Sequence, residues 1–99
     1  MSETEQYIEE RAQRDPEFKA AWEAGEPAFR LRQALIEARI VAGLTQAELA
    51  DRLASHQSAI ARIEAGRVKP SFEILMRYAK ALGVRFEVSA DQVEVRPAA

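Results

Sequence analysis

Residues 43–71 read GLTQAELADRLASHQSAIARIEAGRVKPS, and this stretch decides the fold because it encodes two short helices separated by a tight turn. Gly43 suits the left-handed position that ends a preceding helix. Thr45 and Glu48 have the spacing of a capping box, which predicts that the next helix begins near Gln46. The apolar positions of this helix are Ala47, Leu49, Ala50 and Leu53.

A second short helix is predicted from about Gln57 to Glu64, because apolar residues follow the i, i+3, i+4 spacing of a helix face that packs on a core. These residues are Ala59, Ile60 and Ile63. Gly66 ends the helix. Between the two helices, Ala54 and Ser55 leave room only for an abrupt change of direction. The pattern therefore predicts two helices that cross at a steep angle.

The outward positions of the second helix carry residue types that suit the edges of bases. Gln57 can pair with adenine through both amide atoms, Arg62 can bind guanine with two hydrogen bonds, and Ser58 is a short donor and acceptor. Arg67 and Lys69 follow in the loop, where the chain would meet phosphate. The alternative is that this polar strip is simply a solvated helix face.

The whole segment resembles the helix-turn-helix of the Xre family, which includes Cro and phage repressors, because Gln opens both helices at Gln46 and Gln57. The resemblance implies a mainly α, five-helix domain of the lambda-repressor type that binds double-stranded operator DNA. The base-reading residues would be Gln57, Ser58 and Arg62. Phosphate-binding or supporting roles are implied for Thr45, Gln46, His56, Arg67 and Lys69.

Two positions depart from the pattern of the family. Ala54 stands where the turn usually has Gly, and a left-handed conformation there would cost Ala about 1 kcal/mol, so we expect a slightly altered turn. His56 stands where Ser or Thr usually caps the second helix. It is the only histidine and the chain has no cysteine, so we expect no metal site and assign His56 to the turn or to a phosphate contact.

Composition indicates a small soluble protein without a cofactor. The 99 residues suffice for one domain, and the absence of cysteine fits a reducing compartment. The acidic start MSETEQYIEERAQRD lacks the basic region of a signal peptide, and no apolar run approaches the ~20 residues of a membrane span. We therefore expect a cytoplasmic protein with no membrane partner.

Charge is unevenly distributed along the chain, although the net charge is only −2. Residues 1–26 hold eight acidic and three basic residues, whereas residues 27–83 hold nine basic and five acidic ones. This asymmetry predicts DNA as the partner of the basic segment and something basic as the partner of the acidic one. The alternative is that the acidic arm only keeps the protein soluble. The chain is thus divided into an N-terminal arm (1–26), a helix-turn-helix domain (27–83) and a C-terminal strand (84–99).

Three further helices are predicted around the motif. Asp15 and Pro16 begin one that Gly25 ends, and Phe18 and Trp22 lie one turn apart in it. Two others, over about 27–42 and 71–83, should pack their apolar residues beneath the motif. Their expected buried residues are Phe29, Leu31, Leu35, Ile36, Ala38 and Ala42, followed by Phe72, Leu75, Met76, Ala79 and Leu82.

The C-terminal segment changes to a period of two. Val84, Phe86 and Val88 alternate with polar residues, which predicts a half-buried strand. A single strand is not stable alone, so it needs a partner. We favour the same strand of a second subunit, since a two-fold dimer through Val84, Phe86 and Val88 would set two recognition helices ~34 Å apart. Pairing within the chain through residues 92–96 is the alternative.

The order of these parts resembles the HigA-type antitoxins of bacterial toxin–antitoxin operons over nearly the whole chain. The likeness is most particular in the arm, which reads RDPEFKAAWE before a helix that contains ALIEAR. It implies a partner of the RelE/HigB type, a small basic toxin that cuts mRNA on the ribosome. The antitoxin would neutralise this toxin by binding it, and would repress the shared operon as a homodimer on DNA.

Apolar and aromatic residues of the acidic arm are candidates for the toxin contact, because they supply buried area while the nearby acidic residues supply charge complementarity. These candidates are Tyr7, Ile8, Phe18 and Trp22. We expect Tyr7 and Ile8 to be exposed before a toxin binds. For Phe18 and Trp22, an ordinary role in the core is an equally good interpretation.

An enzyme is not expected, because the sequence has no histidine pair, no cysteine nucleophile and no phosphate-binding glycine loop. Three hypotheses remain: an antitoxin that binds DNA and a toxin, a stand-alone or phage-type repressor that binds only DNA, and a protein-interaction module with a vestigial helix-turn-helix. Toxin binding separates the first from the second. Operator binding separates both from the third.

Overall fold

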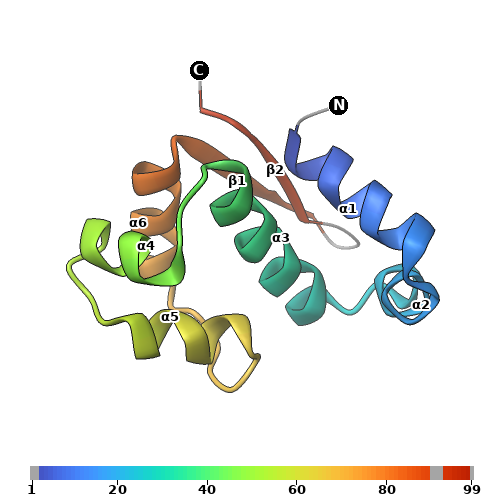
Figure 1. Ribbon diagram of the computed structural model, residues 1–99, viewed down its shortest axis with the longest axis horizontal. Coiled ribbons are helices and arrows are strands. Elements are labelled where there is room, and N and C mark those ends of the chain that lie inside the picture. The colour runs from blue at the N-terminus through green and yellow to red at the C-terminus, as the bar shows by residue number, and fades with distance from the viewer. Residues whose placement is uncertain (1–2, 90–92, 99) are drawn as a thin grey trace.

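A computed structural model describes residues 3–89 and 93–98, which form six helices and a two-stranded sheet (Figure 1). The elements are α1 (Glu3–Arg14), α2 (Pro16–Ala24), α3 (Pro27–Val41), α4 (Gln46–Arg52), α5 (Gln57–Glu64), α6 (Phe72–Leu82), β1 (Val84–Val88) and β2 (Val93–Pro97). The mainly α fold class is confirmed. The five predicted helices correspond to α2–α6, and α1 is a sixth helix. No helix within the described ranges is long and apolar enough to cross a membrane.

Side-chain caps explain where the helices begin. The Asp15 carboxylate accepts a hydrogen bond from the Phe18 N–H at 3.1 Å at the start of α2. The predicted capping box is present at α4: the Thr45 hydroxyl accepts from the Glu48 N–H, and the Glu48 carboxylate accepts from the Thr45 N–H, both at 3.0 Å. These bonds also lower the pKa of Glu48. Capping therefore fixes the direction in which α4 leaves α3.

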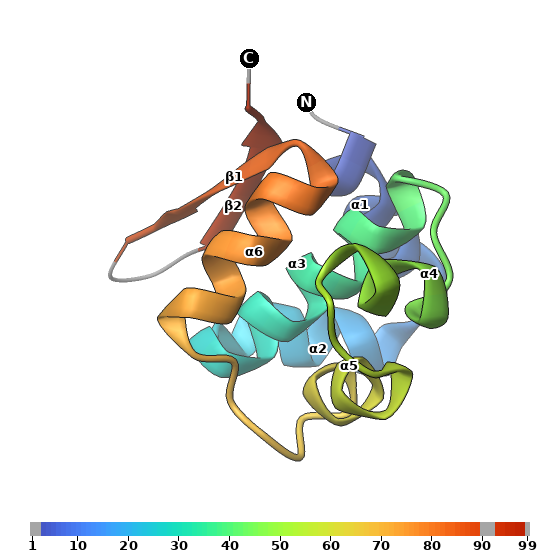
Figure 2. The same ribbon diagram turned by 90° about the vertical axis from the view of Figure 1, so that its left-hand side faces the viewer.

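The core lies where α3, α4, α5 and α6 meet, and Figure 2 shows the last three arranged around α3. Its largest fully buried side chains are Leu35, Leu49, Ile60 and Tyr78, one from each helix. Ala50 is also buried, and its small side chain allows the helices of the motif to approach closely. This packing holds the two helices of the motif in one rigid arrangement.

The expected orientation of α6 is wrong at two positions. Phe72 and Met76 are 78% and 59% exposed, although both were expected to be buried. The buried side of α6 is instead centred on Tyr78, with Leu75 and Leu82 beside it, and residues 72 and 76 are turned away from this side toward solvent. Ala42, also expected in the core, is exposed at the C-cap of α3.

The C-terminal strand pairs within the chain. β1 and β2 are antiparallel in a register that places Phe86 opposite Val95. Val95 is 2% exposed and packs with Ala34 and Ala38 of α3, so β2 is held by apolar burial as well as by backbone bonds. The structure therefore has the alternative arrangement, in which the strand pairs within the chain. The argument that β1 needs a mate in a second subunit is therefore wrong, because β2 supplies that mate.

The N-terminal arm folds back on α3 (Figure 1). Tyr7 is 41% exposed as expected, but Ile8 is only 9% exposed, so the expectation of an exposed Ile8 is wrong. Neighbouring residues of a helix point ~100° apart, and α1 turns Ile8 inward and Tyr7 outward. Phe18 is buried, and its ring centroid lies 5.9 Å from that of Trp22 and 5.8 Å from that of Phe29.

A polar contact anchors α1 to α3. Arg11 Nη1 donates a hydrogen bond to Gln33 Oε1 at 3.2 Å and lies 3.8 Å from Glu37 Oε1. Glu37 is only 4% exposed. Its burial raises its pKa, and the charges of Arg11, Arg14 and Arg39 oppose that rise without cancelling it. The contact between the arm and α3 thus includes the buried carboxylate of Glu37, whose charge the nearby arginines compensate only in part.

The turn of the motif retains a left-handed residue even though that residue is not glycine. Ala54 has a φ of 52°. We expected a slightly altered turn, but Ala54 adopts the left-handed conformation that Gly usually has there. The backbone at Ala54 is therefore strained.

Replacing Ala54 with Gly should raise the free energy of unfolding by about 0.5–1 kcal/mol, because the relief of strain exceeds the extra freedom that Gly gives the unfolded chain. Urea denaturation measures this change. Ala61→Gly, inside α5, is the matched control and should lower the same quantity by about 1 kcal/mol. A destabilised Ala54→Gly variant would show that the turn is not strained.

The stability of the protein should depend on pH through Glu37. Because its folded-state pKa is raised, the folded protein holds this proton more readily than the unfolded chain just above the ordinary carboxyl value of 4.5, and stability falls as pH rises through that interval. The free energy of unfolding of Glu37→Gln minus that of wild type should therefore increase with pH there. Urea titrations at successive pH values test this, with Glu9→Gln at an exposed position of α1 as control. A difference that does not change with pH would refute the assignment.

Candidate nucleic-acid interface

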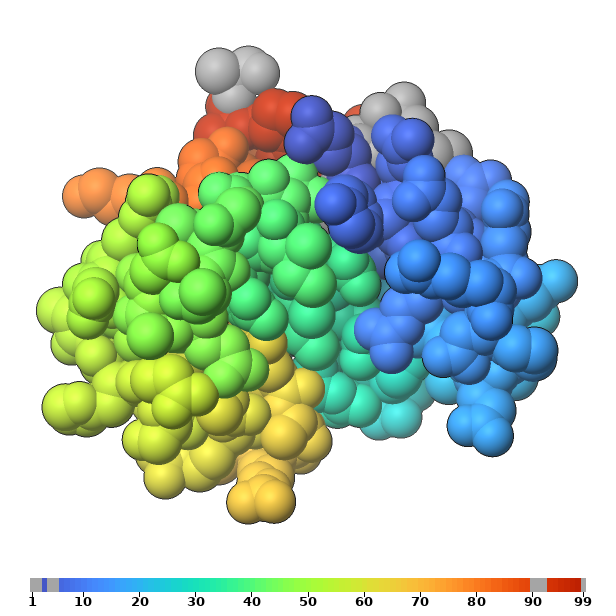
Figure 3. Space-filling view, in the orientation of Figure 1, coloured from blue at the N-terminus to red at the C-terminus, as the bar shows by residue number. Residues whose placement is uncertain are grey.

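The exposed side of α5 carries the residues predicted to read bases. Gln57, Ser58 and Arg62 are all exposed, whereas Ile60 and Ile63 on the other side are buried. Figure 3 shows α4 and α5 on one side of the molecule and the N-terminal arm on the other, so the arm leaves this part of α5 uncovered. The structure therefore brings the three predicted residues together on one accessible helix face.

A chain of polar contacts runs from α3 to the start of α5. Glu64 accepts two hydrogen bonds from Arg39, at 2.7 Å from Nε and 2.9 Å from Nη2. Gln46 Nε2 donates to Glu64 Oε1 at 3.1 Å, and Gln46 Oε1 accepts from Gln57 Nε2 at 2.7 Å. Arg39 also donates to the Leu44 carbonyl at 2.8 Å. The network thereby joins α3, α4, α5 and the loop that precedes α4.

The ionic part of this network is shielded from water. The side chains of Arg39 and Glu64 are 14% and 6% exposed, and two parallel hydrogen bonds join them. The bond to Glu64 raises the pKa of Arg39, so its charge is secure. Each end of the pair is thus well compensated, as a buried charge requires.

The outer part of the network orients the amide of Gln57. Its Nε2 uses one N–H to bond Gln46, and that bond leaves the second N–H and the carbonyl oxygen for other partners. An amide held in this way loses less side-chain entropy on meeting a base than one that moves freely. The interaction between the two glutamines therefore pre-orders a candidate base-reading group.

The residues predicted to bind phosphate have mixed environments. Arg67 and Lys69 are exposed in the loop between α5 and α6, where their charges can reach a phosphate backbone. His56 is the exposed N-cap of α5, but its side chain makes no capping hydrogen bond. The Thr45 hydroxyl is engaged in the capping box, and Gln46 is half-buried in the network. The side chains of Thr45 and Gln46 therefore stabilise the helix-turn-helix through hydrogen bonds within the protein.

Sequence reasoning missed Arg39 and Glu64 as parts of the site. One signal in the sequence could have identified them. Each is a charged residue next to the apolar face of a helix, and a charge that is buried where two helices pack needs a partner of opposite charge. Their separation of 25 positions hides that relation in the sequence.

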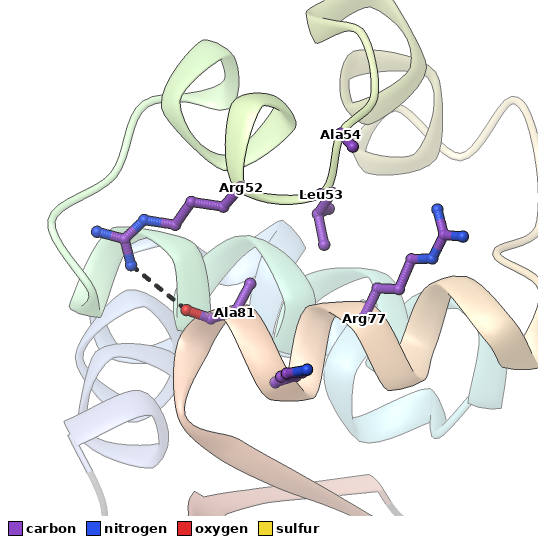
Figure 4. A pocket seen from close by; sticks show the side chains of 6 residues that line it. Arg52, Leu53, Ala54, Arg77 and Ala81 are labelled. Carbon is purple, nitrogen blue, oxygen red and sulfur yellow. Dashed lines mark hydrogen bonds between the residues drawn. The ribbon is translucent and has the colours of Figure 1, made fainter.

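A groove of about 470 Å³ lies on the α6 side of the turn (Figure 4). It is lined by Arg52, Leu53, Ala54, Arg77, Lys80 and Ala81. Arg52 Nη1 donates to the Ala81 carbonyl at 3.4 Å, which ties the end of α4 to α6. The groove is separate from the base-reading face, because its residues come from the end of α4, the turn and α6, and not from the exposed side of α5.

The other predicted sites are less compact. Among the candidate toxin residues, Tyr7 is exposed and Trp22 is half-buried, whereas Ile8 and Phe18 are buried. The three candidate dimerisation residues lie on β1, where Val88 is 70% exposed while Val84 and Phe86 pack partly against the protein's own core. The roles of these residues in toxin binding and dimerisation stay predictions.

Comparison with known proteins agrees with this geometry. The family described as helix-turn-helix matches residues 35–88. Antitoxin HigA1 of Mycobacterium tuberculosis, from strain CDC 1551 / Oshkosh and from strain ATCC 25618 / H37Rv, is 38% identical over 82 residues, which are 83% of this chain and 55% of the relative. The chain therefore spans about half the length of the curated relatives it matches. No solved structure matches the chain significantly.

The family match begins in α3, covers α4, α5 and α6, and ends with β1, so it includes every residue of the Arg39–Glu64 network. It extends over more than half of the chain. The resemblance to HigA-type antitoxins is confirmed by the similarity to HigA1. The chain belongs to the Xre-type helix-turn-helix family.

Proposed function

We propose that this protein is an antitoxin that binds and neutralises an mRNA-cleaving toxin of the RelE/HigB type and represses its own operon by binding operator DNA as a dimer. The observation that carries the DNA-binding part is the exposed face of α5, where Gln57 and Arg62 lie on a helix fixed from below by the Arg39–Glu64 pair. The similarity to HigA1 supports the antitoxin part.

In this proposal, α5 enters the major groove and the loop after it meets the phosphate backbone. Gln57, Ser58 and Arg62 would contact base edges, because they occupy the exposed first two turns of α5. Arg67 and Lys69 would neutralise phosphates, which adds affinity without adding sequence preference. The nine basic residues of segment 27–83 favour the approach to DNA.

The toxin would bind the outer side of α1. Glu3 and Glu10 lie one turn on either side of Tyr7, and all three are exposed. This surface combines an aromatic side chain with negative charge, which suits a basic partner. Ile8 and Phe18 would act indirectly, since their burial holds the arm in place.

A stand-alone repressor without a toxin partner is the second candidate function. The burial of Ile8 and Phe18 favours it, because two of the four apolar residues assigned to the toxin contact already serve the protein's own core. In that case the arm would be a structural layer on α3 and nothing more.

Arg62→Ala should weaken binding to the preferred operator by about 1–3 kcal/mol and relax the preference at one base pair. The measurement is fluorescence anisotropy on duplexes that the wild-type protein selects from a random pool, together with their single-base variants. Lys69→Ala is the matched control, because loss of a phosphate contact should weaken all duplexes alike and reduce the salt slope. An equal loss on every duplex for Arg62→Ala would contradict a base-reading role.

Tyr7→Ala combined with Glu10→Lys should weaken the complex with the small basic protein encoded beside this chain by tenfold or more, about 1.4 kcal/mol, because it removes an aromatic anchor and reverses a charge. Co-purification and calorimetry measure the loss. Glu9→Lys on another side of α1 and Arg62→Ala on α5 are controls that should retain toxin binding. If the wild-type protein binds no such partner, the stand-alone repressor is the correct function.

A further inference from the structure

Arg32 of α3 contacts both an aromatic ring and the backbone at the end of α5. Its Cζ lies 5.4 Å from the ring centroid of Phe29, a distance typical of a cation–π contact. Phe29 is itself held in place, since its ring centroid lies 5.8 Å from that of the buried Phe18. The guanidinium also lies against Gly66, where a Cβ atom would come within 2.7 Å of Arg32 Nη1, so a side chain at residue 66 would displace it. These contacts restrict where the charge of Arg32 lies.

The three arginines of α3 differ in their partners. A guanidinium has five N–H donors. Arg30 donates twice to the Trp22 carbonyl, at 3.1 and 2.8 Å, and Arg39 is paired with Glu64. Within residues 3–89 and 93–98, the donors of Arg32 form no hydrogen bond or ion pair, although the side chain is half-buried. A cation that is held in place without such a partner indicates a site for an anion.

Arg32 lines a groove of about 380 Å³ between the first half of α3 and the loop after α5. Figures 1 and 2 both show this loop beside the N-terminal end of α3. A second cation, the exposed Lys69, lines the same groove, and Leu31 and Ile63 are among its apolar residues. Apolar surroundings weaken the attraction between opposite charges less than open water does. An anion in this groove would therefore meet two cations at a favourable place.

One carboxylate also lines the groove. Glu26 is the exposed N-cap of α3, and residue 26 precedes residue 32 by six positions, which is about 9 Å along the helix axis. Water and salt screen an exposed charge strongly at that distance. We therefore expect the anion at the end of the groove where Arg32 lies against Gly66, and not beside Glu26.

The position of this end of the groove indicates which anion it takes. Gly66 joins α5 to the loop that carries Arg67 and Lys69, the two predicted phosphate contacts. Because Arg32 lies against that junction, its guanidinium would reach the DNA backbone on the same side as the loop when α5 enters the major groove. A planar guanidinium can donate to two phosphate oxygens at once. The groove thus fits a phosphate group of the DNA backbone.

We propose that Arg32, together with Lys69, binds a backbone phosphate at the edge of the operator half-site. The inference rests on the proposed function, because it adds a contact to the DNA-binding surface. It extends that surface from the helix-turn-helix onto α3, where the sequence pattern had assigned only residues that pack beneath the motif. The contact adds affinity without adding sequence preference, because phosphates are common to all sequences.

Loss of the positive charge tests the contact on DNA. Arg32→Gln should weaken binding to the selected operator duplex and to its single-base variants alike, by roughly threefold to tenfold, and should reduce the slope of log affinity against log salt by about one. Fluorescence anisotropy at several salt concentrations measures both. Lys80→Gln is the matched control, since it removes one exposed charge from α6, and it should leave the slope unchanged. An unchanged slope for Arg32→Gln, or an equal change for both variants, would overturn the proposal.

Arg32→Lys separates a phosphate contact from a packing role. Lysine keeps the charge but lacks the planar group that lies against Gly66 and Phe29. The salt slope of Arg32→Lys should therefore stay within about half a unit of the wild-type slope. Glu26→Gln, which removes the opposite charge of the groove, should not reduce affinity. A slope for Arg32→Lys as low as that of Arg32→Gln would mean that the planar group only holds the loop, and would overturn the proposal.

Neutral phosphates identify the contact on the duplex. In a set of duplexes that each carry one methylphosphonate, substitution at one position beside the half-site should weaken the wild-type complex and leave the Arg32→Gln complex unchanged. Arg67→Ala is the control and should remain sensitive at that position, because its lost contact lies at another phosphate. Equal sensitivity of wild type and Arg32→Gln at every position would contradict a contact by Arg32.

If wild type binds no duplex, the proposed function fails, and inorganic phosphate decides the site without DNA. In a proton–nitrogen NMR titration of the full chain, phosphate should shift the signals of the Arg32 Nε–H and the Gly66 amide, whereas chloride at the same ionic strength should shift neither. Arg32→Gln should abolish the shift of the Gly66 amide. A wild-type spectrum in which phosphate moves neither signal would overturn the site.

Discussion

The ion pair between Arg39 and Glu64 is the interaction on which the geometry of the motif depends. It joins the last turn of α3 to the end of α5 through two hydrogen bonds, and through Gln46 it also reaches α4. Because both side chains are shielded from water, loss of one partner would leave an uncompensated charge that costs about 3–5 kcal/mol. The pair therefore sets the angle at which α5 leaves the core.

Short-range chemistry made much of the fold predictable. The caps at Asp15 and Thr45 and the stop at Gly25 are local features, since each depends on residues within one turn of the chain. The exposed positions of α5 were predictable for the same reason, because Ile60 and Ile63 define which side is buried. Local sequence thus predicted where helices begin and which face of α5 is outward.

Long-range choices were not predictable from those patterns. α6 has apolar residues both around Tyr78 and at Phe72 and Met76, so its sequence did not decide which of these two sides is buried. The mate of β1 was uncertain because a hairpin and an intersubunit sheet use the same alternation of residues. The Arg39–Glu64 pair likewise joins elements far apart in the chain. In each case the deciding contact lies on another helix or strand.

α3 connects the two surfaces assigned to DNA and toxin. Arg39 near its end bonds Glu64 of α5, while Gln33 on the preceding turns bonds Arg11 of α1 and Glu37 lies beside it. The arm is therefore a layer packed on the same helix that supports the motif, despite its opposite charge. Removal of residues 1–26 would uncover the buried carboxylate of Glu37 and strip its partner, so a truncation confuses loss of folding with loss of a partner. Substitutions confined to the exposed side of α1 separate these effects, because they leave Ile8, Phe18 and Arg11 in place.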